Sequence, residues 1–311
     1  MEKHATPGTM LEAVRRFSDP QIAHNYFVQH RWPNGAACPL DGCGSMAVAY
    51  MPKRRRFYCR DCKQQFTAKV GTIFEDSPIG FDKWLPAFWL LASNRNGISS
   101  HELARALKVT QKTAWFMLHR IREAMRDKTF AKLSGTVESD ETYIGPKARS
   151  GLHAGPHHGR KSRGPAVGKQ IVQGIVQRKG DVRAFVVPSA KKGTLQENIR
   201  KHVKPGSQIF TDALHSYWGL SDDYVHEVVN HAVEYVRGHV HTNNIEGFWS
   251  VLKRTLKGTY VAPRPEHLQR YVEEQVFRFN QRHSPDGPRF AKAVKATDGK
   301  RLTYKALTGK A

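Results

Sequence analysis

The sequence predicts a mixed α/β protein with a small metal-binding module and a helical region ahead of its sheet. Three observations support this class. Runs of β-branched residues alternate with helical patterns over residues 133–283, and helical spacing dominates residues 76–132. All four cysteines fall into two short-spaced pairs. A chain of 311 residues suggests about two domains and can bury a core without disulfide bonds.

The charge balance points to a polyanionic partner. Lys and Arg number 50 against 27 Asp and Glu, which gives a formal net charge of +23 at pH 7. Long-range attraction and counterion release make a polyanion the simplest partner, although a purely solvated basic surface is the alternative. The apolar runs fall short of the ~20 residues of a membrane span. The first residues also lack the apolar stretch of a secretion signal, so we expect a cytoplasmic protein.

Five segments follow one another along the chain. Residues 1–30 carry apolar side chains at helical spacing and predict one or two short helices. Residues 31–75 are rich in turns and contain the cysteines. Residues 76–132 predict helices, whereas strands and helices mix over residues 133–283. Residues 284–311 read as a basic, weakly patterned tail.

The cysteine pairs predict a zinc ribbon. Structural zinc takes four thiolates in a tetrahedron, and two close pairs separated by a hairpin can supply them. The expected ligands are Cys38, Cys43, Cys59 and Cys62. The first pair has a longer spacing than usual, and buried apolar cysteines or a redox pair are the alternatives. Arg54 and Arg55 lie at the tip of the intervening hairpin and indicate either DNA contact or a solvated turn.

A pair of helices is expected over residues 97–127. Ser99 or Ser100 can cap the first helix, and Thr110 can cap the second after a short break. Two helices joined by a tight turn resemble a helix-turn-helix that reads DNA, although an ordinary helical hairpin fits the same pattern. The basic residues of the second helix that are candidates for DNA contact are Lys112, Arg120 and Arg122.

Five β-branched runs predict the strands of the sheet, at residues 136–144, 169–177, 182–187, 208–211 and 225–229. A helix over residues 194–202, with Thr194 as its N-cap, lies between the third and fourth strands. Two further helices are expected over 245–256 and 266–282. The glycine-rich basic segment 146–168 predicts either a loop against phosphates or a disordered insertion.

Three acidic residues occupy positions from which they can converge. Asp140 follows an apolar strand, Asp212 ends another strand, and Glu246 lies in a helix. Oxygen ligands from separate elements suit Mg²⁺, and two such ions can promote an in-line phosphoryl displacement. We therefore expect these residues to bind two Mg²⁺ or Mn²⁺ ions. Glu141 is expected to point to the opposite face of the strand.

The helix that contains Glu246 offers further groups for DNA. Lys253 follows two turns later on the same face and can hold a phosphate, unless the two residues form only a solvated stripe. Asn244 can cap the helix or position a DNA strand. His241 is expected to donate a hydrogen bond near the site.

The ordered set of motifs resembles bacterial insertion-sequence transposases of the ISXO type. The carrying segments are the two cysteine pairs, GTIF at 71–74, KTAWFMLHRIREAM at 112–125, DETYIG at 140–145, TDALHSY at 211–217, HTNNIEGFWSVLKR at 241–254 and FRFNQR at 277–282. The resemblance implies a ribonuclease-H-like catalytic core and Mg²⁺-dependent cleavage and transfer of element ends. The family's two aspartates fall on Asp140 and Asp212, its glutamate on Glu246 and its helix lysine on Lys253.

From this resemblance we expect a ribonuclease-H-like catalytic domain over 133–283, preceded by the zinc ribbon and the helix-turn-helix region. Its partners would be double-stranded DNA, as inverted repeats and target, bound by a homodimer or larger assembly near the prokaryotic nucleoid. Two other hypotheses stay open. One is a non-catalytic DNA-binding regulator, and the other is a metal-dependent nuclease on the same scaffold.

Overall fold

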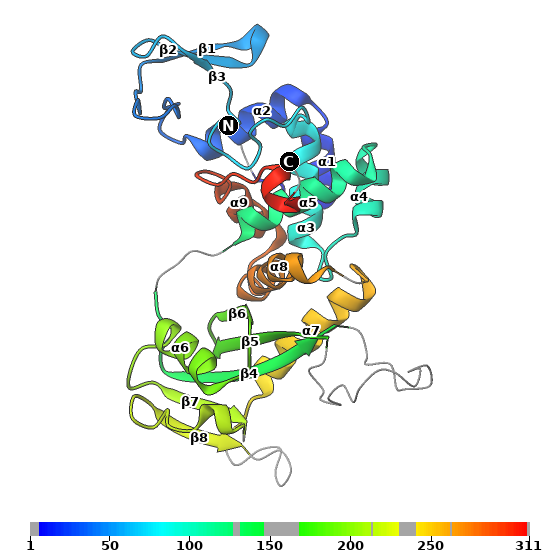
Figure 1. Ribbon diagram of the computed structural model, residues 1–311. Helices are drawn as coiled ribbons and strands as arrows, with labels where there is room; N and C mark the ends of the chain where they lie inside the picture. Colours follow the sequence, from blue (N-terminus) through cyan, green and yellow to red (C-terminus); the bar gives the residue numbers. More distant parts are fainter. Residues whose placement is uncertain are drawn as a thin grey trace. The chain divides into compact units, whose positions relative to one another are not determined.

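The computed structural model describes residues 6–126, 131–145, 168–212, 214–229, 241–261 and 263–309. The chain divides into two compact units (Figure 1). Unit 1 combines Met1–Arg126 with Gln281–Ala311, and unit 2 comprises Asp127–Asn280. Within the described ranges, no helix is long and apolar enough to cross a membrane. The basic insertion predicted at 146–168 lies outside the described residues except for its last glycine.

Unit 1 begins with the two short helices that the sequence predicts. Helix α1 (Met10–Phe17) begins at Thr9, and helix α2 (Pro20–Arg31) begins at Asp19. Both cap side chains accept hydrogen bonds from backbone N–H groups of the first turn, which the helix itself leaves unpaired. Phe17, Tyr26 and Phe27 are buried, whereas the apolar side chains of Leu11, Val14 and Ile22 are exposed.

A three-stranded antiparallel sheet follows. Its strands are β1 (Val48–Met51), β2 (Arg56–Cys59) and β3 (Gln65–Phe66), in the order β1-β2-β3. A single 3-10 turn (Pro52–Arg54) joins β1 to β2, and Arg55 closes it with a left-handed φ of 48°. The basic residues of this turn therefore stand at the tip of a tight hairpin.

Three helices complete the N-terminal part of unit 1: α3 (Phe81–Ser93), α4 (Ser100–Leu107) and α5 (Gln111–Met125). Ser99 forms a capping box with Glu102 at the start of α4, and Thr110 caps α5. Both caps agree with the sequence-based expectation.

The C-terminal segment is not the weakly patterned tail that the sequence suggests. It forms helix α9 (Asp286–Lys295) and the short helix α10 (Tyr304–Thr308), and α9 packs against α3. Phe290, Ala293 and Val294 are buried. These apolar residues share one face of a single short helix among many basic residues, which is why the pattern is weak in the sequence.

Unit 2 is built on a five-stranded mixed sheet. Its strands are β4 (Thr136–Ile144), β5 (Gln170–Gln177), β6 (Val182–Val187), β7 (Gln208–Asp212) and β8 (Val225–Val229), in the spatial order β6-β5-β4-β7-β8. The first three strands pair antiparallel, whereas β7 and β8 run parallel to β4. This order and these directions form a ribonuclease-H-like sheet, and each strand lies where the sequence predicts it.

Helices cover both faces of this sheet (Figure 1): α6 (Lys192–His202), α7 (Asn243–Gly258) and α8 (Leu268–Asn280). Residues of β5 alternate between two cores, as the pleat requires. Ile175 packs with Leu195 and Ile199 of α6. Val172 and Val176 pack with residues of α7 and α8.

One predicted helix start is wrong. Helix α6 begins at Lys192 after the N-cap residue Lys191, two residues before the start expected from Thr194. The hydroxyl groups of Thr194 and Ser189 instead form a hydrogen bond of 3.1 Å. Thr194 therefore ties the first turn to the preceding loop without capping the helix.

Candidate functional site

Three carboxylates of unit 2 converge beside the parallel pair β4 and β7. Asp140, Glu141 and Asp212 each offer an oxygen within 4.8 Å of the other two. The parallel register pairs Thr136 with Gln208 and Glu138 with Phe210. Asp140 and Asp212 each follow two residues after the last of these pairs. The structure thus brings together the two aspartates singled out in the sequence, and it adds Glu141.

The three carboxylates repel one another in a poorly solvated place. Burial raises the pKa of Asp140 to about 6, and the charges of Asp212 and Glu246 add to the shift. Burial likewise raises the pKa of Glu141 to about 7, with repulsion from Asp212 and Asp140. A bound divalent cation would relieve both effects, and carboxylate oxygens are the ligands that hard cations prefer. The donor set therefore fits such a cation.

Glu141 was not predicted as part of the site. The hydroxyl of Tyr217, a fully buried residue on the α6 side of the sheet, donates a 2.9 Å hydrogen bond to its Oε2. The strand pleat therefore does direct Glu141 away from Asp140, as expected. Its longer side chain nevertheless brings an oxygen into the carboxylate group. The acidic pair at positions 140 and 141 is the one sequence signal for this.

Glu246 lies at the border of the carboxylate group, outside the three oxygens that meet within 4.8 Å. It is exposed in the first turn of α7, and its carboxylate accepts a 3.1 Å hydrogen bond from Thr242. One turn later, the indole N–H of Trp249 donates to Asp140 Oδ2 at 2.8 Å. The side of α7 that carries Trp249 therefore faces Asp140. Lys253 is exposed two turns beyond Glu246.

A further carboxylate, that of Glu138, anchors the start of α7. It is fully buried and accepts hydrogen bonds from the backbone N–H groups of Asn244 (2.9 Å) and Ile245 (3.1 Å). The side chain of Asn244 also donates to Glu138, at 2.7 Å, and Arg178 forms an ion pair with it at 2.8 Å. His241 Nδ1 lies 3.5 Å from the same carboxylate. The Asn244 side chain thus takes part in holding the helix start, and His241 lies beside the same anchor.

The four cysteine sulfurs of unit 1 form a second candidate metal centre. All four lie within 4.8 Å of one another, with Sγ–Sγ distances of 3.8 Å for Cys38–Cys62 and 3.6 Å for Cys43–Cys59. Zinc–sulfur bonds of about 2.3 Å in a tetrahedron require sulfurs about 3.8 Å apart. The backbone N–H of Cys62 helps to lower the pKa of the Cys59 thiol to about 6. This arrangement fits zinc.

The longer spacing of the first cysteine pair does not prevent the four sulfurs from lying close together. Gly42, just before Cys43, and Gly44, just after it, have left-handed φ values of 76° and 60°, and they let the chain turn on both sides of Cys43. The four residues between Cys38 and Cys43 are therefore compatible with the four-cysteine cluster.

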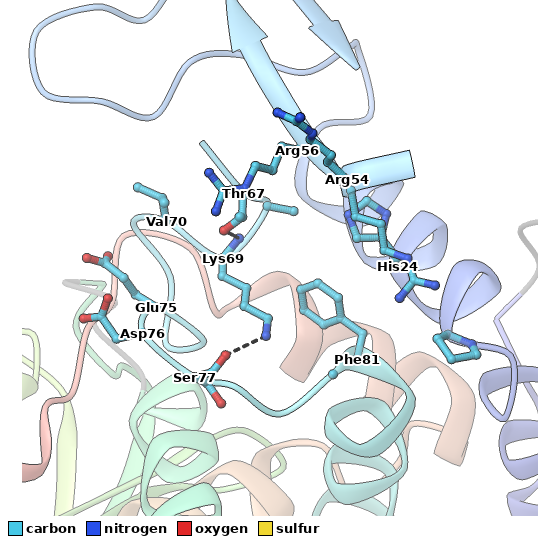
Figure 2. A pocket seen from close by; sticks show the side chains of 14 residues that line it. His24, Arg54, Arg56, Thr67, Lys69, Val70, Glu75, Asp76, Ser77 and Phe81 are labelled. Carbon is cyan, nitrogen blue, oxygen red and sulfur yellow. Dashed lines mark hydrogen bonds between the residues drawn. The ribbon is translucent and has the colours of Figure 1, made fainter. Parts of the chain in front are cut away.

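A basic pocket opens beside the hairpin tip of unit 1 (Figure 2). Its volume is about 500 Å³, and Arg54, Arg55 and Arg56 line one side. Lys69 lines the pocket as well, and its ammonium group donates to the carbonyl oxygens of Ser77 (2.8 Å) and Ile79 (2.7 Å). Burial lowers the pKa of Lys69 to about 8.

Two acidic side chains, Glu75 and Asp76, also line this pocket. Arg301 pairs with both of them, at 3.4 Å and 2.7 Å. Because the acids have a cationic partner, the arginines of the hairpin dominate the charge of the pocket. Anionic groups such as DNA phosphates suit this lining.

The predicted helix-turn-helix buries most of its second helix. Arg120 and Arg122 are 6% and 1% exposed, and Arg120 donates to the carbonyl oxygens of Glu75 (2.9 Å) and Leu302 (3.1 Å). These two arginines are bound within unit 1, which contradicts the expectation that they contact DNA. Lys112, in the first turn of α5, is exposed and lies over the ring of Tyr304.

Two family models match the chain. The ISXO2-like transposase domain matches residues 132–280, and the transposase zinc-ribbon domain matches residues 19–65. Together they cover more than half of the chain. The first corresponds closely to unit 2, and the second contains all four cysteines and the hairpin.

Two curated proteins and one solved structure illustrate what the chain is similar to. An uncharacterized protein in transposable element ISH50 of Halobacterium salinarum is 28% identical over 78% of this chain and 85% of its own length. An uncharacterized transposase-like protein of Haemophilus influenzae is 36% identical over 32% of this chain and 80% of its own. The crystal structure of a pre-cleavage Mos1 transpososome aligns with 70% of this chain and 79% of that chain, at 15% identity and a TM-score of 0.28. With its zinc-ribbon module, its ribonuclease-H-like sheet and both family matches, the chain belongs to the ISXO2-like family of DDE transposases.

Proposed function

We propose that this transposase cleaves the ends of its element and joins them to target DNA, with Asp140, Asp212 and Glu246 as the catalytic carboxylates. The observation that carries the proposal is the meeting of the Asp140, Glu141 and Asp212 oxygens within 4.8 Å on a ribonuclease-H-like sheet. Glu141 joins the proposed cation ligands because of this distance. Glu246 belongs to the proposed catalytic carboxylates because its charge acts on Asp140 from the adjacent helix.

The protein side chains have separable tasks in this proposal. Asp140, Glu141 and Asp212 would hold Mg²⁺ or Mn²⁺, which supplies charge neutralisation for the attacking and leaving oxygens of a phosphoryl transfer. Tyr217 fixes the Glu141 carboxylate. Glu138 fixes the start of α7 and with it the place of Glu246. Catalysis would then rest on positioning and charge stabilisation without a covalent protein intermediate.

DNA binding is assigned to basic surfaces of both units. In unit 1 we propose the hairpin arginines Arg54 and Arg55, the adjacent pocket and Lys112, and in unit 2 Lys253 beside the carboxylates. The net charge of +23 supports a polyanionic partner. Transposition needs two element ends held together, so we propose a homodimer or larger assembly on DNA. The zinc centre is given a structural role, because its four thiolates leave no open position.

The test is an assay of purified protein with Mg²⁺, duplexes that carry the element's terminal repeats, and a target plasmid. We expect nicking at the element end and joining of the freed 3′ end to the target. Asp140→Asn and Asp212→Asn should abolish both steps while leaving DNA binding intact. Cleavage without joining would identify a nuclease, and binding without either step would identify a DNA-binding regulator.

A further inference from the structure

We propose that Trp249 and Gly174 form a positioning pair that orients the Asp140 carboxylate for its cation, an inference that rests on the proposed function. The indole N–H of Trp249 donates to Asp140 Oδ2 at 2.8 Å. An indole has one donor and no acceptor, so this bond engages one carboxylate oxygen in a fixed direction. An oxygen of the same carboxylate lies within 4.8 Å of oxygens of Glu141 and Asp212, where a cation would bind.

Gly174 provides the space that this contact needs. It is the register partner of Asp140 on the neighbouring strand β5. A Cβ atom at position 174 would lie 2.6 Å and 2.7 Å from two ring carbons of Trp249, and 2.6 Å from Cδ1 of Ile245. The indole therefore lies directly against the backbone of β5. Any larger residue at position 174 would push the ring away from Asp140.

The indole cannot shift freely, because its helix and its own surroundings are both fixed. Trp249 is 4% exposed, and it belongs to the core between the sheet and helices α7 and α8. Its ring centroid lies 5.2 Å from that of Phe248. Two residues before Asp140, Glu138 holds the first turn of α7 through two backbone N–H groups. The hydrogen-bond donor thus reaches Asp140 from a rigid support.

This arrangement has a consequence beyond stability. A buried indole N–H needs an acceptor, so the bond alone would fit a purely structural role. A carboxylate that binds a metal, however, depends on outer partners for its orientation, and their loss typically costs about 10–100-fold in metal affinity. The positioning role therefore predicts a specific loss of cation affinity when the N–H is removed.

The experiment compares Trp249→Phe with the wild type, with Trp218→Phe as the control at an exposed tryptophan of the same unit. Mn²⁺ binding is measured by electron paramagnetic resonance without DNA, and the Mg²⁺ dependence of end cleavage is measured separately. We expect Trp249→Phe to weaken Mn²⁺ binding about 10-fold or more and to raise the half-saturating Mg²⁺ concentration equally. The cleavage rate at saturating Mg²⁺ should stay within about threefold of wild type. Trp218→Phe should change neither quantity.

Two further variants keep the test decisive if Trp249→Phe folds poorly. Replacing Trp249 by 3-benzothienylalanine preserves the ring shape and removes only the donor, and Gly174→Ala keeps the donor but displaces the ring. Both should weaken Mn²⁺ binding in the same way. Unchanged Mn²⁺ affinity in the folded variants would overturn the positioning role while leaving the proposed function standing. Wild-type protein that neither binds Mn²⁺ nor cleaves DNA would instead overturn the proposed function.

Discussion

Asp140, Glu141 and Asp212 lie close together, and burial and mutual repulsion raise the pKa values of Asp140 and Glu141. Asp140→Asn removes one of the repelling charges with almost no change in volume. We expect the variant to be as thermally stable as wild type, or more stable, in the absence of divalent cations. Cleavage should fall by about 10³-fold or more, because the bound cations contribute several kcal/mol to the transition state.

The same variant separates stability from cation binding. A ligand at 100 times its Kd stabilises the folded state by about 2.7 kcal/mol, so Mg²⁺ or Mn²⁺ should raise the Tm of wild type but not that of Asp140→Asn. Asp222→Asn, at an exposed aspartate of the same unit, is the control and should retain the full rise. A cation-induced Tm rise that survives in Asp140→Asn would exclude this site.

A histidine remote from the carboxylates should make unit 2 sensitive to acid. Burial, together with the nearby charge of Arg183, lowers the pKa of His202 to about 4 from an ordinary value of 6.5. The imidazole stacks on Phe185 and lies 3.1 Å from Arg183 Nη1. Between these two pKa values the unfolded chain binds the proton and the folded chain does not. Stability should therefore be complete above pH 6.5 and decline toward pH 4.

Thermal unfolding of wild type and His202→Gln across this range provides the measurement. Glutamine can accept the hydrogen bond of Arg183 but does not titrate. The Tm of His202→Gln should therefore fall less than that of wild type between pH 7 and pH 4.5. Equal acid sensitivity of the two proteins would place the titrating group elsewhere.

At the residue scale, the sequence predicts the ends of elements better than the partners of side chains. Asp140 and Asp212 stand out because each interrupts or ends an apolar strand, and the structure places them together. The role of Glu138 depends on backbone groups 106 and 107 residues further along the chain. No local pattern encodes such a partnership. The burial of Arg120 and Arg122 has no local sequence signal for the same reason, since it follows from packing within unit 1.

The zinc ribbon is an element too small to hold its shape through apolar contacts alone. Its sheet has three strands, of which β3 spans two residues. We expect one zinc per chain by elemental analysis, and we expect Cys59→Ser to lose it. Loss of zinc should reduce DNA affinity, because the hairpin that carries the arginines would lose its support. A zinc-free protein that binds DNA at full affinity would contradict this.

The hairpin tip offers a test of DNA contact that does not depend on cleavage. Arg54→Ala and Arg55→Ala should each weaken binding to all duplexes alike, because phosphate contacts carry no sequence information. If each contacts a phosphate, the slope of log affinity against log salt concentration should become shallower by about 0.9 per variant. Arg264→Ala, at an exposed arginine of unit 2, is the control and should change neither value. An unchanged slope in both tip variants would remove the hairpin from the DNA-binding surface.

At the scale of elements, local signals were reliable where a cap or a β-branched run decides the structure. Ser99 and Thr110 begin their helices as expected, and the five strands occupy their predicted positions. Helix α6 starts earlier than expected, because Lys191 offers no side-chain cap that a sequence pattern could reveal. Helix α5 has the spacing of a recognition helix, yet its neighbours in unit 1 cover most of it.

The chain leaves unit 1 after Arg126 and returns to it at Gln281, so unit 2 is an insertion within the sequence of unit 1. The sequence could not reveal this, since the returning segment is short and basic. Phe290 of α9 shows how the core of unit 1 depends on this returning segment. It is fully buried, and its ring lies 5.8 Å from Phe17, 5.9 Å from Tyr26 and 5.3 Å from Trp89 between centroids. One residue of the C-terminal segment thus joins α1, α2 and α3.

Phe290→Ala should therefore destabilise unit 1 selectively. Because each unit has its own core, we expect two unfolding transitions by calorimetry. The variant should lose about 3–5 kcal/mol in the transition of unit 1, the usual cost of truncating a buried phenylalanine. The transition of unit 2 and its Mn²⁺ binding should be unchanged, whereas DNA affinity should fall at temperatures where unit 1 melts. Leu11→Ala, at a 59% exposed leucine of α1, serves as the control. Equal shifts of both transitions would show that the two units unfold as one, and the C-terminal segment would then support the whole chain.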